Sequence, residues 1–134
     1  ATGSRLKSVG GSTEKVVPTV AYLGPHGSDL KKFIRVLGAE GGEIKIILPD
    51  GLDEDIVIGR DEQGATLVIT NDKLVSRRHA VIRKTKFNTY EIQDLGSANG
   101  TFVGGRPILK EKPTPLRIGG GRIQIGRVMI SFCL

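Results

Sequence analysis

Short β-prone runs recur along most of the chain, and each is followed by turn-forming residues. Runs of about four to eight residues rich in Val, Ile, Phe and Thr are typical of strands, whereas Gly, Asn, Asp and Pro mark turns. In chain order the runs are EIKIIL, DIVIG, TLVI, HAVIRK, YEIQDL, TFV, PLRI, RIQIG and VMISFCL. The pattern predicts an all-β antiparallel sandwich or barrel rather than alternating βα units.

The segments before these runs are less regular. In SDLKKFIRVLG, Leu30, Phe33, Ile34 and Leu37 fall at helical spacing, but FIRVL is β-prone and the turn-like GAEGG follows it. We therefore expect a strand that forms a hairpin with EIKIIL. Residues 1–28 mix Gly, Ser, Thr and Pro without a sustained period, which predicts a flexible tail or linker before a domain at residues 29–134. VVPTVAYL could dock on that domain, but its proline argues against a central strand.

The length and composition of the chain fit a single soluble domain. A length of 134 residues with 38% hydrophobic residues is sufficient for one core. The single cysteine excludes a disulfide framework and a CxxC metal site and is compatible with a reducing, intracellular location. No apolar run approaches the roughly 18 residues of a membrane span. We expect no metal or cofactor and no membrane partner.

Charge is distributed unevenly within the net total of +6. Residues 50–62 are mainly acidic, whereas the charged residues from Lys73 to Lys86 are all basic. A basic cluster can attract phosphates of any kind.

Three short segments combine groups that bind anions: GR at Gly59-Arg60, SRRH at residues 76–79 and SANGT at residues 97–101. Each lies where a predicted strand begins or ends, and loops at one end of a sandwich cluster in space. A guanidinium can grip a phosphate through two parallel hydrogen bonds, and hydroxyl and backbone N–H groups add donors. These groups suit holding a phosphate, and no set of groups for breaking one accompanies them.

The order and spacing of these segments resemble the forkhead-associated (FHA) domain family. The resemblance covers roughly residues 31–134 and includes DIVIGRD and DLGSANGTFVGG around the motifs. It implies an eleven-stranded β-sandwich that recognises phosphothreonine peptides through loops at one end. It also favours a strand over a helix at KKFIRVL.

The resemblance implies specific roles for the binding residues. Arg60 and Ser76 would contact the phosphate, and Arg77, directly after the serine, could add a phosphate or backbone contact. Asn99 would hydrogen-bond the peptide backbone. At position 98 relatives often carry Ser or Thr, which can donate to the phosphate, whereas Ala98 has no hydroxyl and predicts a weaker or differently shaped pocket.

Other residues would shape or support that site. Gly59 would allow close packing behind the arginine, Gly100 a turn that side chains resist, and His79 would brace the loops without touching ligand. Thr101, the last residue of the SANGT segment, is also expected to support the structure of the site. Val75, Ala98 and Gly100 are the groups expected near the γ-methyl of phosphothreonine, and Leu74 suggests an apolar preference downstream of it.

Competing functions are weaker. A nucleic-acid binder could use the basic cluster, but aromatic residues are only 4% and no helix is expected for a major groove. A scaffold with a vestigial pocket is a further alternative. A Ser–His nucleophile in SRRH has no third residue or oxyanion motif. We therefore expect a monomeric, non-enzymatic module whose partner is a protein phosphorylated by an upstream Ser/Thr kinase.

Overall fold

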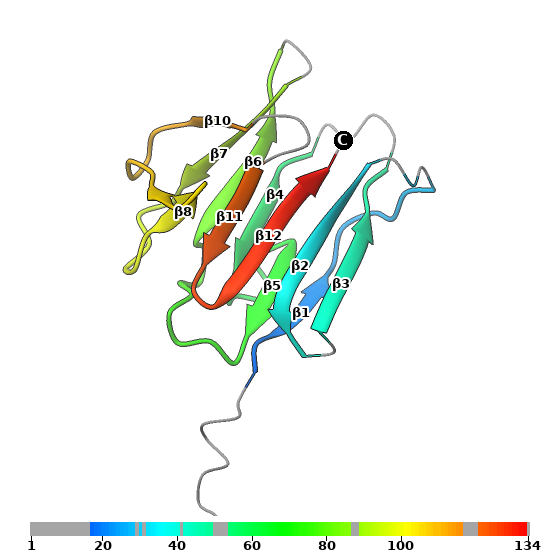
Figure 1. Cartoon of the computed structure of the whole chain (residues 1–134), viewed down its shortest axis with the longest axis horizontal. Helices are drawn as coiled ribbons and strands as arrows, with labels where there is room; N and C mark the ends of the chain where they lie inside the picture. The colour runs from blue at the N-terminus through cyan, green and yellow to red at the C-terminus, as the bar shows by residue number, and fades with distance from the viewer. Residues whose placement is uncertain are drawn as a thin grey trace, which may run out of the picture.

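The structure, a computed structural model, describes residues 17–28, 30, 32–40, 42–49, 54–86, 89–116 and 121–133. These residues form twelve strands and no helix (Figure 1). The strands are β1 (Thr19–Tyr22), β2 (Phe33–Ala39), β3 (Gly42–Ile47), β4 (Ile56–Gly59), β5 (Leu67–Thr70), β6 (Ala80–Lys84), β7 (Tyr90–Asp94), β8 (Thr101–Val103), β9 (Arg106–Pro107), β10 (Thr114–Leu116), β11 (Gly121–Ile125) and β12 (Val128–Cys133).

The strands form two six-stranded sheets, which confirms the predicted all-β sandwich. The first has the order β1-β5-β4-β6-β7-β10 and the second β3-β2-β12-β11-β8-β9. Neighbouring strands are antiparallel except β4 and β5, which run parallel. After β4 the chain doubles back, so that the Thr66 N–H donates to the Val57 carbonyl at 2.7 Å, and β5 then repeats the direction of β4. The expectation of purely antiparallel sheets was wrong at this pair.

The described strands number twelve rather than the expected eleven. One of them, β1, lies in the segment expected to be a flexible tail and pairs with β5 over its whole length. It is an edge strand that begins directly after Pro18, as the missing N–H of proline requires. Val20 and Tyr22 pack against the core, which explains why the strand docks. Residues 1–16 of the predicted tail lie outside the described residues, so the tail there stays a prediction.

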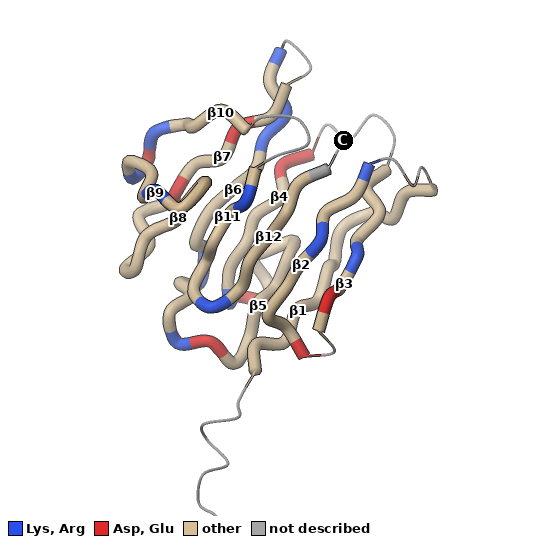
Figure 2. The backbone as a smooth tube through the Cα atoms, in the orientation of Figure 1, with Lys and Arg blue, Asp and Glu red and all other residues tan. Residues whose placement is uncertain are grey.

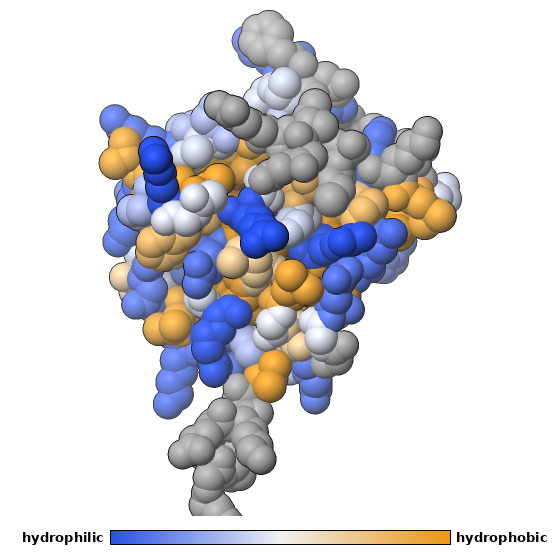
Figure 3. All heavy atoms as spheres, viewed as in Figure 1, coloured by the Kyte–Doolittle hydropathy of each residue, from blue (hydrophilic) through white to orange (hydrophobic). Residues whose placement is uncertain are grey.

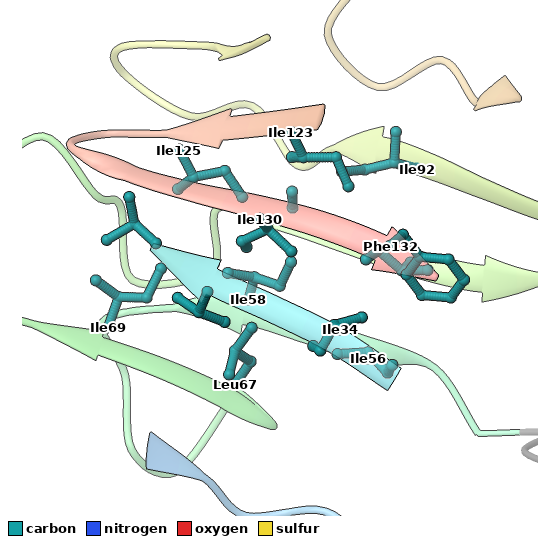
Figure 4. Close-up of a cluster of buried hydrophobic side chains, with 14 of the residues drawn as sticks. Ile34, Ile56, Ile58, Leu67, Ile69, Ile92, Ile123, Ile125, Ile130 and Phe132 are labelled. Atoms are coloured by element: carbon teal, nitrogen blue, oxygen red, sulfur yellow. The ribbon is translucent and has the colours of Figure 1, made fainter. Parts of the chain in front are cut away.

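The hairpin of β2 and β3 is confirmed, with Ala39 opposite Gly42 at its turn. Alternation along the strands places one set of side chains between the sheets. The resulting core is rich in isoleucine (Figure 4). Its largest fully buried side chains are Phe132, Ile34, Leu48, Ile56, Ile58, Leu67, Ile69, Ile82, Ile92, Ile123, Ile125 and Ile130. This packed layer fixes the strand ends from which the three anion-binding segments emerge.

Candidate functional site

The three segments singled out in the sequence meet at one end of the sandwich. The Arg60 N–H donates to the Ser76 carbonyl at 3.0 Å, which joins the end of β4 to the loop before β6. The Ala98 N–H donates to Ser76 Oγ at 3.1 Å, which joins that loop to the one after β7. Residues far apart in sequence are thus held together by two hydrogen bonds at Ser76, one accepted by its carbonyl and one by its hydroxyl.

Arg60 is exposed, but its side chain is anchored. Its Nε donates to the Val75 carbonyl at 2.7 Å. Within the described part of the chain, its two terminal amino groups donate to no other group. A guanidinium fixed at Nε still presents donors in a planar fork, which is the geometry that matches phosphate oxygens.

The hydroxyl of Ser76 is held in place by one hydrogen bond and can donate another. Because Oγ accepts a hydrogen bond from the Ala98 N–H, the hydroxyl hydrogen remains available to donate outward. The Ala98 N–H, which could have taken the place of the missing hydroxyl at position 98, is engaged with Ser76 instead.

Asn99 and Leu74 form the rim beside this pair. Asn99 Nδ2 donates to the Leu74 carbonyl at 3.1 Å, and both side chains are exposed. The carboxamide of Asn99 is therefore oriented by the loop before β6. Its oxygen can accept a hydrogen bond from a peptide N–H.

His79 lies beneath the loops and is fully buried. Its Nδ1 accepts from the Ser76 N–H at 3.0 Å, and Nε2 bonds the Gly100 carbonyl at 2.8 Å. A carbonyl cannot donate, so the ring hydrogen is on Nε2. Burial lowers the pKa of His79, while the Gly100 carbonyl and the Asp94 and Asp72 carboxylates act in the opposite direction.

The bonds of His79 also exclude a Ser–His nucleophile. The imidazole contacts the backbone nitrogen of Ser76, whereas the Ser76 hydroxyl bonds Ala98. Neither ring nitrogen is available to take a proton from Oγ. His79 therefore connects two loops and does not activate a serine.

Asp94 organises the loop after β7, a role that sequence reasoning missed. Its buried carboxylate accepts from the Ser97 N–H at 2.8 Å and from Ser97 Oγ at 2.7 Å, and Thr101 Oγ1 approaches it at 3.4 Å. Ser97 Oγ in turn accepts from the Gly100 N–H at 2.9 Å. Gly100 has φ +84°, a conformation that favours glycine. The available signal was an aspartate at the end of an apolar run with serine three residues on, a pattern typical of side-chain-stabilised turns.

Asp72 was missed as well. It is 2% exposed, and its carboxylate accepts from the Leu74 N–H at 3.0 Å and from the Arg127 N–H at 2.7 Å. Arg127 Nε lies 3.6 Å from the same carboxylate. Asp72 thereby joins the loop before β6 to the turn between β11 and β12.

Val75 differs from its expected role. Its side chain is 1% exposed and belongs to the core, so it has almost no surface to offer to a ligand methyl group. The residue contributes through its carbonyl, which anchors Arg60. Of the three groups expected around the methyl, Ala98 and Gly100 remain at least partly exposed.

Gly59 is required by a backbone contact. A Cβ at this position would lie 2.0 Å from the Arg77 carbonyl oxygen. We expect Gly59→Ala to force β4 away from the loop before β6 and to destabilise the domain by about 2 kcal/mol or more. Chemical denaturation measures this loss. Gly104→Ala is the comparison, because Gly104 has φ +60° but open space around it; equal losses in both variants would contradict the contact.

The site is strongly cationic. Lys73, Arg77 and Arg78 are exposed in the loop before β6, and the Asp61 N–H next to Arg60 donates to the Arg77 carbonyl at 3.1 Å. In the part of the chain that the structure describes, no group of three His, Cys, Asp or Glu side chains could hold a metal ion. Nor does any helix there have the length and apolar character needed to cross a bilayer.

The sequence pattern of the FHA domain matches residues 56–126, a span that includes β4, all three loops and β11. This chain belongs to the FHA domain family. The expected resemblance is thereby confirmed. The prediction of a non-enzymatic domain agrees with this family, since proteins similar to this chain are named as an oxoglutarate dehydrogenase inhibitor and a glycogen accumulation regulator.

Similar proteins and solved structures support the family assignment. An oxoglutarate dehydrogenase inhibitor from Corynebacterium jeikeium is 38% identical over 65 residues, which are 48% of this chain and 42% of the relative. This chain therefore aligns with less than half of that relative. The FHA domain of CT664 from Chlamydia trachomatis is 29% identical with a TM-score of 0.63, and the alignment covers 76% of this chain and 96% of that one. An FHA domain described in an analysis of phosphothreonine-dependent interactions is 27% identical with a TM-score of 0.56, over 76% of this chain and 96% of that one.

Proposed function

We propose that this FHA domain is a phosphothreonine-dependent interaction module that reads phosphorylated partner proteins in signalling or assembly. The observation that supports the proposal most is the pairing of an anchored guanidinium with an outward-donating hydroxyl. Arg60 is held at Nε by Val75, and Ser76 Oγ is held by the Ala98 N–H. Both donors are fixed before a ligand arrives, so little side-chain entropy is lost on binding.

The role that we propose for each residue follows from the chemistry of its side chain. Arg60 and Ser76 hold the phosphate, with Arg77 adding a nearby positive charge. Asn99 bonds the peptide backbone, so that an extended peptide lies across the loops. Gly59, His79, Gly100 and Thr101 keep the loops in place, and Leu74 offers an exposed apolar contact on the rim.

The partner class follows from the same site. We infer a protein phosphorylated on threonine by an upstream Ser/Thr kinase inside the cell, bound by a monomeric domain. The FHA relative described as phosphothreonine-dependent supports this inference.

A degenerate peptide library tests the proposal. Immobilised domain is presented with two libraries that are identical except for phosphothreonine or threonine at the fixed central position. The proposal predicts retention of the phosphorylated library alone, with enrichment of particular flanking residues. Equal retention of both libraries would contradict it.

We expect phosphothreonine to bind at least several-fold tighter than phosphoserine. Both satisfy Arg60 and Ser76, so the difference must come from the γ-methyl. One buried methyl contributes roughly 0.8 kcal/mol, and the β-branched side chain is stiffer before binding. Because the side chain of Val75 is buried, this contact rests on Ala98 and the backbone at Gly100. Calorimetry with a matched peptide pair measures the ratio, and a ratio of one would rule out the methyl contact.

A further inference from the structure

The second sheet has an outer face that no other described element covers (Figure 1). Ile34, Val36 and Ile130 point inward and are buried. Because side chains alternate along a strand, the residues between them point outward. Strands β2 and β12 each have a paired strand on both sides, so this outer face extends beyond them onto β3 and β11.

The strand register places cations in a row across this face. Arg35 lies opposite Lys45 on β3 and opposite Ser131 on β12, and Ser131 lies opposite Arg122 on β11. Neighbouring strands are about 4.8 Å apart, so the row extends over about 15 Å. Lys45, Arg35 and Arg122 are all exposed. Figure 2 shows the basic positions on β3, β2 and β11.

Of the three cations in this row, Arg35 alone has a carboxylate partner in the described part of the chain. Arg35 Nε lies 3.3 Å from Glu43 Oε2, and both side chains are about half exposed. Lys45 Nζ lies 4.0 Å from the centre of the Phe33 ring, so this cation rests on an aromatic face instead of on a carboxylate. An exposed ion pair contributes little to stability, so a carboxylate of a partner can compete with Glu43 for Arg35, and a cation over a ring keeps its charge.

An apolar row with a hollow runs beside the cations. Leu37, Met129, Gln124 and Phe102 lie opposite one another in register on four adjacent strands. Leu37 is 39% exposed. A hollow of about 400 Å³ lies at one end of the face, lined by Gly104, Gly105, Arg122, Gln124 and Met129. Figure 3 shows hydrophobic and hydrophilic atoms intermingled on this side of the molecule.

We propose that this face is a second docking surface, whose occupant is an acidic segment of a protein partner with interspersed apolar side chains. Carboxylates would pair with Lys45, Arg35 and Arg122, and an apolar side chain would enter the hollow beside Met129. A symmetric pairing with a second copy of this chain is disfavoured, because it would bring the same cationic rows together. An acidic partner is complementary to both features of the face.

The surface is connected to the phosphate site. The turn between β11 and β12 ends the exposed face, and its Arg127 N–H bonds Asp72 in the loop that carries Ser76. This bond places one end of the sheet face next to the loop of Ser76, so in the proposal a partner held at the loops continues onto the sheet. In this form the inference rests on the proposed function, although the surface can be tested without it.

The direct test uses an unphosphorylated peptide of alternating Glu and Leu and follows the backbone amides by NMR. The proposal predicts shifts on β2, β12 and β11, no shifts with a Lys-Leu peptide of equal length, and loss of the shifts in the double variant Arg35→Glu, Arg122→Glu. Lys86→Glu, a single charge reversal of the same kind at an exposed position of another hairpin, should leave them intact. Absent shifts, or shifts confined to the loops of Arg60 and Ser76, would overturn the proposal.

A second experiment tests whether one ligand can bind the phosphate site and the sheet face together. A phosphothreonine peptide linked through Gly-Ser residues to the acidic segment should bind about tenfold tighter than the phosphothreonine peptide alone, and the double variant should lose this gain only. If the short phosphopeptide does not bind but the Glu-Leu peptide still shifts the sheet, the proposed function fails and the second surface stands. Binding of phosphatidylserine vesicles through this face without binding of the Glu-Leu peptide would instead reject a protein occupant.

Discussion

His79→Ala is expected to lower the free energy of unfolding by about 2 to 5 kcal/mol and to weaken phosphopeptide binding as well. The substitution leaves the Ser76 N–H and the Gly100 carbonyl without their partners and opens a cavity at a fully buried position. Each unsatisfied buried group costs about 1–3 kcal/mol, and a cavity adds to this loss. Because the two bonds connect two binding loops, the site loses its alignment together with its stability.

Thermal and urea unfolding measure this effect. A loss of this size lowers the melting temperature by about 10 °C or more. Arg60→Ala is the matched control, because Arg60 is exposed and its removal should hardly change stability. If His79→Ala melts like the wild type and yet does not bind, the histidine is a direct ligand contact and its bracing role is wrong.

The stabilising effect of His79 should also depend on pH. Burial lowers the pKa of this imidazole in the folded state below its unfolded value of about 6.5. Below pH 6.5 the unfolded chain therefore binds a proton that the folded chain resists, and stability falls with decreasing pH by at most about 1.4 kcal/mol per pH unit. Between pH 7.5 and 5.5 we expect the wild type to lose more stability than His79→Ala, as measured by urea unfolding at each pH. Equal losses in both would show that His79 is not responsible.

Arg60→Ala should reduce affinity for a phosphothreonine peptide by about 100-fold, and Ser76→Ala by about tenfold or more. Hydrogen bonds to a charged group contribute roughly 1.5–3 kcal/mol each, and Arg60 offers two to the phosphate in the proposed geometry. Arg60→Lys should recover little, since lysine keeps the charge but has neither the fork nor the Nε donor that bonds Val75. Titration calorimetry at fixed ionic strength measures all three variants.

Arg83→Ala provides the control for these losses. Arg83 also carries a positive charge, but it is already bonded to Gln93 and Asp55 on and beside the first sheet. Its removal should leave phosphopeptide affinity within about twofold, because its charge is already paired with Asp55 and a charge outside the binding loops is screened by salt. A loss equal to that of Arg60→Ala would indicate general electrostatic attraction in place of a defined site.

Much of the fold could be predicted because strands such as β4, β6 and β12 alternate or are continuously apolar between clear turns. β1 was not assigned as a strand, although docking of VVPTVAYL was expected, because a proline and a short run resemble a linker. Pairing with the edge of β5 and packing of Val20 and Tyr22 on the core make the strand favourable. The parallel pairing of β4 and β5 was also out of reach. It depends on where the chain returns after Gly59, which is a tertiary contact and leaves no periodicity in the sequence.

The site residues also fall into those that the sequence could predict and those that it could not. Arg60, Ser76 and Asn99 could be proposed because they stand in short motifs at strand ends. The roles of the Asp72 and Asp94 carboxylates could not be predicted. They accept hydrogen bonds from loop N–H groups that come together only after the sheets have packed. Val75 shows the converse error, since its sequence position next to Ser76 suggested a ligand contact while its side chain points into the core.

The most direct measurement is a calorimetric titration of the wild-type domain with one library-selected peptide in its phosphothreonine and threonine forms, repeated with Arg60→Ala. The proposed function predicts saturable one-to-one binding of the phosphorylated form, no measurable binding of the unphosphorylated form, and a loss of about 100-fold in the variant. Equal affinity for both forms, or an unchanged affinity in Arg60→Ala, would contradict phosphothreonine recognition at this site.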